Sequence, residues 1–280
     1  MKIALCIANL AAKGKQGPDA YKLGFNYINE SLLNKYNIDI FLHSYEPELK
    51  DELLNMYNPV DYLFEEIPDF IEKYQDLNEI YTSGWQTGPA HSYQNVFSMM
   101  YSRYMVGQLK SKHEKKNNFI YDWVIVIRYD IFSRLHLEPI FFNPNLNSNM
   151  FYSSFHKQLN IGPNDQWFYS NSKNMDMLFS LFNELRSYFL NDSEFLKSAE
   201  NGWINSNEHN LYSCEILYNT NSTNNGQKMN IGWICNAHLI YKWFFYIRDL
   251  WNLENMMFPM TKLRQELYME HKNHPNVICE

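Results

Sequence analysis

The stretch "YDWVIVIRYDIF" (residues 121–132) decides the fold class of this chain. Its centre, Val124 to Ile127, is an unbroken run of branched apolar side chains. A strand with one solvated face alternates polar and apolar residues, whereas a continuous Val and Ile run is typical of a strand buried on both faces. Arg128 and Asp130 follow the run directly. Because open α/β sheets bind ligands beyond the carboxyl ends of their strands, this pair is the first candidate site.

The sequence before this strand predicts alternating strands and helices. The predicted elements are a strand at 2–8, a helix at 17–36, a strand at 37–45, a helix at 47–57 and a strand at 60–66. A β-α-β-α-β order is typical of the nucleotide-binding half of a doubly wound sheet. The sequence therefore predicts an α/β protein with a parallel sheet in its first half.

The second half of the chain is predicted to add a long helix, further strands and a helical C-terminal part. The predicted elements are a helix at 91–115, strands at 149–155 and 166–172, helices at 172–190 and 206–220, an apolar, β-like segment at 230–248, and a helix with a tail at 251–280. No internal repeat or low-complexity linker interrupts this order. We therefore expect one domain over 1–280, with a nucleotide-binding half at 1–130 and an acceptor-binding half at 131–280.

Composition excludes several classes of protein. The net charge of −7 among 280 residues argues against a nucleic-acid partner, which usually requires a basic surface. No apolar run reaches the roughly 18 residues of a membrane-spanning helix, so no transmembrane segment is expected. Four separated cysteines without a CxxC pair argue against a zinc site and favour a reducing, cytoplasmic location. The GxGxxG, P-loop, GxSxG and HExxH motifs are absent, so the chemistry must come from dispersed residues.

Asp130 is the candidate metal ligand. A carboxylate at the end of a central strand can hold Mg²⁺ or Mn²⁺ while a diphosphate and water complete the coordination shell. Arg128 is then a candidate for binding the sugar or a phosphate. The alternative, to which the spacing alone gives equal weight, is an Arg–Asp pair that closes the end of the strand.

Asp165 is the candidate catalytic base. It follows the Gly-Pro-Asn turn of residues 162–164 and precedes an aromatic strand, a place from which a carboxylate can take a proton from a sugar hydroxyl. Gln166 beside it is a candidate sugar-binding residue, and Glu208 is the reserve candidate for the base. The alternative is that Asp165 only caps the turn, as Asp side chains commonly do.

The ends of the first two strands supply further candidate nucleotide-binding residues. They are Ala8, Asn9 and Leu10 after the first strand, and His43 and Ser44 at the end of the second. All lie at the sheet edge predicted for Arg128, where a base and ribose would bind. For His43 a core histidine with satisfied ring nitrogens is an equally good interpretation.

The long helix at 91–115 adds Gln94 and Ser98, which share one face at i, i+4 spacing. They are candidates for contacting the sugar, or for capping a neighbouring strand. Arg103, farther along the helix, is interpreted as structural, and His238 is a weaker candidate still.

In their order and spacing, these segments resemble a family of GT-A-type glycosyltransferases from bacterial surface-polysaccharide loci and from large DNA viruses that glycosylate their own capsids. The matching segments are Lys2 to Ala8, Asp39 to Tyr45, Arg128 to Asp130 and Asp165 to Phe168. In this resemblance the "RxD" strand end stands in for the DxD motif and "DQW" for a later "DQF" segment. Arg in the first place of the motif leaves Asp130 as the single carboxylate.

The resemblance implies transfer of a sugar from a nucleotide-sugar donor, with a UDP-sugar expected and a pentose such as xylose among the candidates, to a hydroxyl of a glycan or glycoprotein. Asp130 would bind the diphosphate through Mn²⁺ or Mg²⁺, and Asp165 would act as the base of an inverting reaction. Two alternatives remain. One is a carbohydrate- or nucleotide-binding protein of this fold without turnover. The other is a sugar nucleotidyltransferase, which needs a glycine-rich phosphate loop near the first strand, where "AAKGKQGPD" (residues 11–19) stands.

Overall fold

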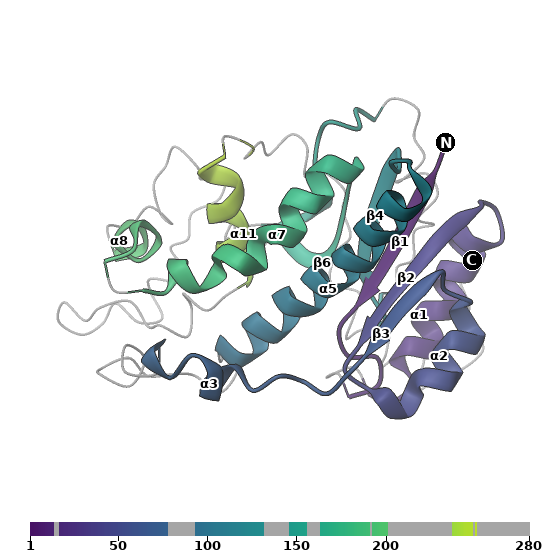
Figure 1. Cartoon of the computed structure of the whole chain (residues 1–280), viewed down its shortest axis with the longest axis horizontal. Coiled ribbons are helices and arrows are strands. Elements are labelled where there is room, and N and C mark those ends of the chain that lie inside the picture. Colours follow the sequence, from purple (N-terminus) through teal and green to yellow (C-terminus); the bar gives the residue numbers. More distant parts are fainter. Residues whose placement is uncertain are drawn as a thin grey trace.

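The fold is seen in a computed structural model, shown in Figure 1. The residues that it describes are 1–13, 17–77, 93–131, 146–155, 163–190, 192–200, 237–248 and 250. The helices predicted at 206–220 and 251–280, and Glu208 with them, lie outside the described residues.

A six-stranded mixed sheet forms the centre of the fold, in the order β3-β2-β1-β4-β6-β5. The strands are β1 (Ile3–Ala8), β2 (Ile38–Ser44), β3 (Asp61–Phe64), β4 (Trp123–Arg128), β5 (Tyr152–Phe155) and β6 (Pro163–Ser170). β1 to β4 are parallel, whereas β6 runs antiparallel to both β4 and β5. The predicted mixed, mostly parallel sheet flanked by helices is confirmed.

Helices cover both faces of the sheet (Figure 1). On one face lie α1 (Ala20–Ile28), continued by a π-helical turn (Asn29–Leu33), and α2 (Lys50–Tyr57), which follows a 3₁₀ turn (Pro47–Leu49). On the other lie α5 (Tyr93–Asn117) and α7 (Ser172–Tyr188), with α11 (Ala237–Tyr246) against β6. The short helices α3 (Phe70–Lys73) and α8 (Glu194–Glu200) complete the described part of the chain.

The two faces of β1 explain why α5 lies so near the sheet. Ala4, Cys6 and Ala8 face α5 and α7, whereas Ile3 and Leu5 belong to the core under α1 and α2. All are buried, as the apolar run predicts. Small side chains on the α5 face let the helix axis approach the sheet, and the larger ones fill the opposite core. Burial raises the pKa of the Cys6 thiol, so this free cysteine is an inert core residue.

The prediction of a β-like segment at 230–248 is wrong for its described part. Residues 237–246 form α11, a helix in which seven consecutive side chains from Leu239 to Phe245 are buried. Because nearly all of its side chains are buried, α11 has a short and almost continuous apolar run, and such a run cannot be distinguished from a buried strand by pattern alone.

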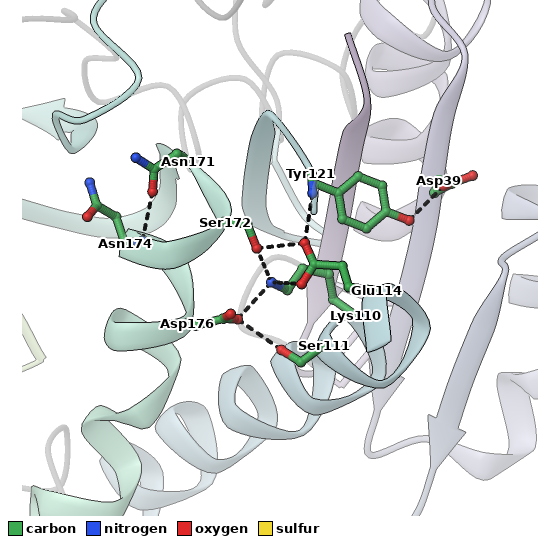
Figure 2. A network of polar contacts seen from close by, with 9 residues as sticks. All are labelled: Asp39, Lys110, Ser111, Glu114, Tyr121, Asn171, Ser172, Asn174 and Asp176. Carbon is green, nitrogen blue, oxygen red and sulfur yellow. Dashed lines mark hydrogen bonds and ion pairs between the residues drawn. The ribbon is translucent and has the colours of Figure 1, made fainter. Parts of the chain in front are cut away.

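A buried ionic network joins α5 to α7 at the sheet edge where β1 and β4 begin (Figure 2). We call it the Lys110 cluster; it consists of Lys110, Ser111, Glu114, Ser172 and Asp176. The Lys110 ammonium lies 2.8 Å from Glu114 Oε2 and 2.7 Å from Asp176 Oδ1, and it also donates to Ser172 Oγ. Ser172 in turn donates to Glu114 Oε1 over 2.7 Å. Each of the three ammonium protons therefore has an acceptor.

In the described ranges of the chain, no helix is both long and apolar enough to cross a lipid bilayer.

Candidate functional site

The candidate site lies at the edge where the parallel strands end. Ala8, the last residue of β1, pairs directly with Arg128 at the end of β4. The antiparallel ladder between β4 and β6 ends at Ile127 opposite Trp167, so Gln166 and Asp165 reach the same edge from the other direction. Residues far apart in sequence therefore meet where an open α/β sheet binds its ligands.

Arg128 and Asp130 form a two-armed ion pair. Arg128 Nε donates to Asp130 Oδ1 over 2.9 Å, and one terminal nitrogen donates to Oδ2 over 3.1 Å. The Arg128 side chain is 16% exposed and that of Asp130 3%. Burial acts to lower the pKa of the Arg128 guanidinium, but the neighbouring Asp130 and Asp165 carboxylates outweigh it and the pKa is raised. Arg128 is therefore a fixed cation at the end of a central strand.

Asp165 is the second carboxylate at this cation. It is half-buried, as is Gln166 beside it, and its charge acts on Arg128. The structure thus brings together the three charged residues that the sequence singles out, Arg128, Asp130 and Asp165. A second guanidinium, that of Arg103, contacts the Asp165 peptide, so two cations and two carboxylates meet at this edge.

Side chains of α5 and α11 bind the backbone of the segment around Asp165. Arg103 on α5 donates to the Asp165 carbonyl oxygen and to the Tyr241 hydroxyl. His238, also on α11, donates from Nδ1 to the Pro163 carbonyl oxygen over 2.6 Å. Sequence reasoning assigned Arg103 only a structural role and treated His238 as weak, because the placement of α11 on β6 was not predicted.

A chain of hydrogen bonds supports Asn9 at the end of β1. The Asn9 backbone N–H donates to Ser102 Oγ over 2.8 Å, Ser102 Oγ lies 2.7 Å from His43 Nδ1, and His43 Nε2 lies 2.9 Å from Glu65 Oε1. This bond from His43, aided by Tyr101, lowers the pKa of the Glu65 carboxyl. His43 is fully buried with both ring nitrogens bonded, so it supports the site rather than facing a ligand.

Asn9 itself has an unused donor. Its backbone φ is 88°, a left-handed conformation that Asn tolerates better than most residues. The residue is 8% exposed, and its side-chain nitrogen Nδ2 has no hydrogen-bond partner among the described residues. A buried amide without a partner is costly unless a ligand or water completes it. Asn9 is therefore the predicted binding residue whose environment best fits a ligand contact.

The other predicted binding residues lie either at the ends of β1 and β2 or on α5. At the strand ends, Ala8 is buried and Leu10 is half-buried. Ser44 Oγ accepts from the Glu46 backbone N–H over 3.2 Å. Gln94 holds residues 68–70, because its amide accepts from Phe70 N over 2.8 Å and donates to Pro68 O over 2.9 Å. Ser98 donates to the carbonyl oxygen of residue 94 over 2.7 Å. For Gln94 and Ser98 the structure shows these supporting contacts, and sugar binding stays a prediction.

Glu46 fills an anion-binding turn after β1 that the sequence did not reveal. Its fully buried carboxylate accepts from the backbone N–H groups of Ala11, Ala12 and Lys13, the last over 2.7 Å. Successive N–H groups of this kind form a nest that commonly binds phosphate. In this chain the nest is occupied by the protein's own carboxylate. A phosphate loop in this part of the β1–α1 connection is thereby disfavoured.

The donor set for a divalent metal is small. Within the described part of the chain, no group of three or more His, Cys, Asp or Glu side chains could hold a metal ion. Asp130 is present, but both of its oxygens accept from Arg128. Mg²⁺ in phosphate-binding sites is often held by one or two carboxylates with substrate oxygens. These residues therefore fit a metal only together with a diphosphate.

No protein-family model matches the sequence, and no curated protein does. Among solved structures, the chain is similar to mouse xyloside xylosyltransferase 1 in its apo form, with 11% identity, 72% of this chain and 75% of that chain covered, and a TM-score of 0.38. It is also similar to the apo form of the glycosyltransferase GlyE of Streptococcus pneumoniae TIGR4, with 12% identity, 96% of this chain and 59% of that chain covered, and a TM-score of 0.37. At such TM-scores the function has to be derived from the site itself.

Proposed function

We propose that this chain transfers a sugar from a nucleotide-sugar to a hydroxyl of a glycan acceptor at the edge formed by the ends of β1, β4 and β6. The observation that carries the proposal is Arg128, a cation that is 16% exposed, paired with Asp130 and under the charge of Asp165 at the end of a central parallel strand. A planar guanidinium suits diphosphate oxygens, and a second carboxylate nearby suits proton removal. The order of the matching segments in the sequence supports the same activity.

In the proposed reaction, Asp165 acts on the acceptor and Arg128 acts on the leaving group of the donor. The Asp165 carboxylate takes the proton of the acceptor hydroxyl, whose oxygen forms a bond to the anomeric carbon. The bond from that carbon to the nucleoside diphosphate breaks, and the leaving diphosphate keeps the electron pair. Arg128 stabilises the negative charge that develops on the diphosphate, and such electrostatic stabilisation commonly contributes more to the rate than any other effect. With the base opposite the leaving group, the configuration is inverted.

We propose that a divalent cation binds only together with the nucleotide-sugar donor. Mn²⁺ or Mg²⁺ bound to diphosphate oxygens and Asp130 would neutralise the leaving group. Because Arg128 already engages both Asp130 oxygens, binding of the metal alone is expected to be weak. The nucleotide would lie toward Asn9, whose unpaired amide can donate to an acceptor atom of the base or ribose.

A second candidate is a nucleotide-sugar-binding protein without turnover. The specific observation in its favour is that Asp130, the only acidic residue of the Arg128-Tyr129-Asp130 motif, is already paired with Arg128. The motif has no second carboxylate to hold a metal. A sugar nucleotidyltransferase is the weaker alternative, because Glu46 occupies the N–H groups of residues 11–13 that would otherwise bind a phosphate.

The proposal is tested by a thermal-shift screen of the full chain against UDP-, GDP- and dTDP-sugars, each with and without Mn²⁺. A ligand at one hundred times its Kd stabilises the native state by about 2.7 kcal/mol. We expect at least one nucleotide-sugar to raise Tm, more strongly with Mn²⁺, while Mn²⁺ alone has little effect. Absence of a shift with every donor would contradict both binding candidates. Release of the free nucleoside diphosphate then separates the enzyme from the binding protein.

Asp130→Asn sharpens the metal part of this test. The amide keeps the shape of the side chain and one acceptor for Arg128, but it is a poor ligand for a hard cation. We expect the extra Tm shift caused by Mn²⁺ to disappear while the metal-free shift by the donor remains. The control is Asp122→Asn, an exposed carboxylate that accepts from the Lys2 backbone N–H. An unchanged Mn²⁺ effect in Asp130→Asn would mean that the metal is bound elsewhere or by the donor alone.

A further inference from the structure

Arg103 is a buried cation with an incomplete set of partners. The residue is 3% exposed, in the middle of α5, and its two terminal nitrogens donate to the Tyr241 hydroxyl and the Asp165 carbonyl oxygen. Its Nε has no hydrogen-bond partner among the described residues. The guanidinium also lies over the rings of Phe168 and Tyr241, each 5.4 Å from the centroid.

Stability alone does not explain an arginine at this position. Burying a charge is unfavourable unless it is fully paired, and apolar residues of similar volume often replace buried ionic groups without loss of stability. The cation–π contacts with Phe168 and Tyr241 offset part of the cost. What an apolar residue cannot replace is the pair of N–H donors that join α5 to the Asp165 backbone and to α11.

These donors fix the position of Asp165. Upstream of it, His238 holds the Pro163 carbonyl oxygen over 2.6 Å, and at Asp165 itself Arg103 holds the peptide oxygen. Downstream, Phe168 packs on Tyr241 with ring centroids 4.6 Å apart. The segment of β6 that carries Asp165 is thereby attached to α11 on both sides, while the Asp165 charge acts on Arg128.

We propose that Arg103 is a positioning residue, which through Tyr241 and the Asp165 peptide holds the Asp165 carboxylate in its working position beside Arg128. This inference rests on the proposed function in one respect, that Asp165 is the base. Arg103 itself does not touch the reacting atoms. A misplacement of a catalytic group by about 1 Å can cost about 10²-fold in rate.

The test compares Arg103→Met, Tyr241→Phe and Asp165→Asn in the full chain, with the UDP-, GDP- or dTDP-sugar that gives the largest Tm shift as the probe and release of its nucleoside diphosphate as the readout. We expect Arg103→Met to lower kcat about 10²-fold with the KM for the donor nearly unchanged. Tyr241→Phe keeps the ring and removes only the hydroxyl, so a smaller loss in kcat is expected without loss of fold. This second variant decides the matter if Arg103→Met does not fold.

The double variant Arg103→Met/Asp165→Asn tests whether Arg103 acts through Asp165. If it does, the double variant is hardly slower than Asp165→Asn alone, because the positioned group has already lost its function. A further loss of the full factor seen for Arg103→Met would overturn the inference. We also expect Arg103→Met to raise the hydrogen-exchange rates of the backbone amides in 163–167 and 237–243. The amides in the N-terminal turns of α7 should stay protected.

Matched controls separate positioning from general stability. Arg186→Met removes an exposed arginine that pairs with Asp76, and no change in kcat is expected. Lys110→Met removes a buried cation about two turns farther along α5, whose partners are Glu114, Asp176 and Ser172, so it should lower Tm without the kcat loss. An impaired Asp165→Asn together with a normal Arg103→Met or Tyr241→Phe would overturn this inference alone. A normal Asp165→Asn, or a wild-type chain inactive toward the whole donor panel, would overturn it together with the proposed function.

Discussion

Two buried polar clusters occupy opposite edges of the same sheet, and they differ in how completely their hydrogen bonds are made. In the Lys110 cluster every ammonium proton has an acceptor, and Glu114 also receives the Tyr121 backbone N–H over 2.8 Å. At the candidate site, Arg103 Nε and Asn9 Nδ2 have no partner among the described residues. Complete networks stabilise a fold, whereas unpaired buried groups are typical of sites that are completed by a ligand.

The largest effect on stability is expected from Lys110→Met. It leaves the buried Glu114 carboxylate without its cation, and removing one partner of a buried ion pair costs about 3–5 kcal/mol. Urea unfolding at pH 7 measures the change in the free energy of unfolding. The control is Lys112→Met, farther along α5, where the side chain is 71% exposed and pairs with Asp61 over 3.1 Å. A surface substitution of this kind changes stability by about 0.5 kcal/mol or less. Equal effects of the two variants would contradict the distinction between the two clusters.

Gly24→Ala is expected to disturb the candidate site from the opposite face of the sheet. A Cβ at this position of α1 would lie 2.0 Å from the carbonyl oxygen of Tyr129, the residue between Arg128 and Asp130. Because backbone cannot move aside easily, overpacking should cost about 1–3 kcal/mol and also weaken donor binding.

Gly107→Ala is the matched control for this variant. Its Cβ would lie 2.4 Å from the ring of Phe179 and 2.8 Å from Phe179 Cβ, so this variant is overpacked as well, but at the contact between α5 and α7 instead of beneath the candidate site. Both glycines lie within helices, so both variants gain the same helix propensity. Unfolding curves and donor-induced Tm shifts measure the two effects. A Gly24→Ala protein that binds the donor as tightly as Gly107→Ala does would contradict the close packing of α1 on the end of β4.

A smaller effect, which is present at neutral pH and lost in acid, is expected from Glu65. Its pKa is lowered in the folded state by the bond from His43, so its contribution to stability is present above the ordinary glutamate pKa of about 4.3 and is lost as the pH falls through the lowered value. Glu65→Gln should therefore lower Tm at pH 7 and reduce the fall in Tm between neutral and acid pH. Glu48→Gln, at an exposed pair with Lys13, is the control. Parallel Tm–pH curves for wild type and Glu65→Gln would contradict this role of Glu65.

Much of the fold and part of the site follow from the sequence. The strands β1, β2 and β4 are short apolar runs bounded by polar residues, and side chains at their carboxyl ends necessarily share one edge of a parallel sheet. That reasoning correctly brings Arg128 and Asn9 to one edge. It does not extend to Asp165, which precedes the strand predicted at 166–172 and reaches this edge because β6 pairs antiparallel with β4.

The parts that could not be predicted depend on contacts across long stretches of sequence. The β-like pattern at 230–248 concealed α11, and with it the bond from Arg103 to Tyr241, 138 residues away. One signal was present: Arg103 lies three residues after Met100 and three before Val106, on the apolar face of a helix, where a charge requires a reason. Glu46 left no such trace, because its partners are backbone N–H groups, which every sequence supplies.

Donor binding by Arg128→Lys tests the central claim most directly. Lysine keeps the charge beside Asp130, but an ammonium cannot bridge the carboxylate and a diphosphate as the planar guanidinium does. The measurement is calorimetric titration of the wild type and the variant with the nucleotide-sugar that gives the largest Tm shift, at pH 7 with Mn²⁺ present. We predict an affinity for the donor that is about tenfold or more lower, equivalent to about 1.4 kcal/mol or more, in a protein whose Tm without ligand is nearly unchanged. An Arg128→Lys protein that binds the donor as tightly as the wild type would show that Arg128 only closes the end of β4, and that the diphosphate is not bound by this residue.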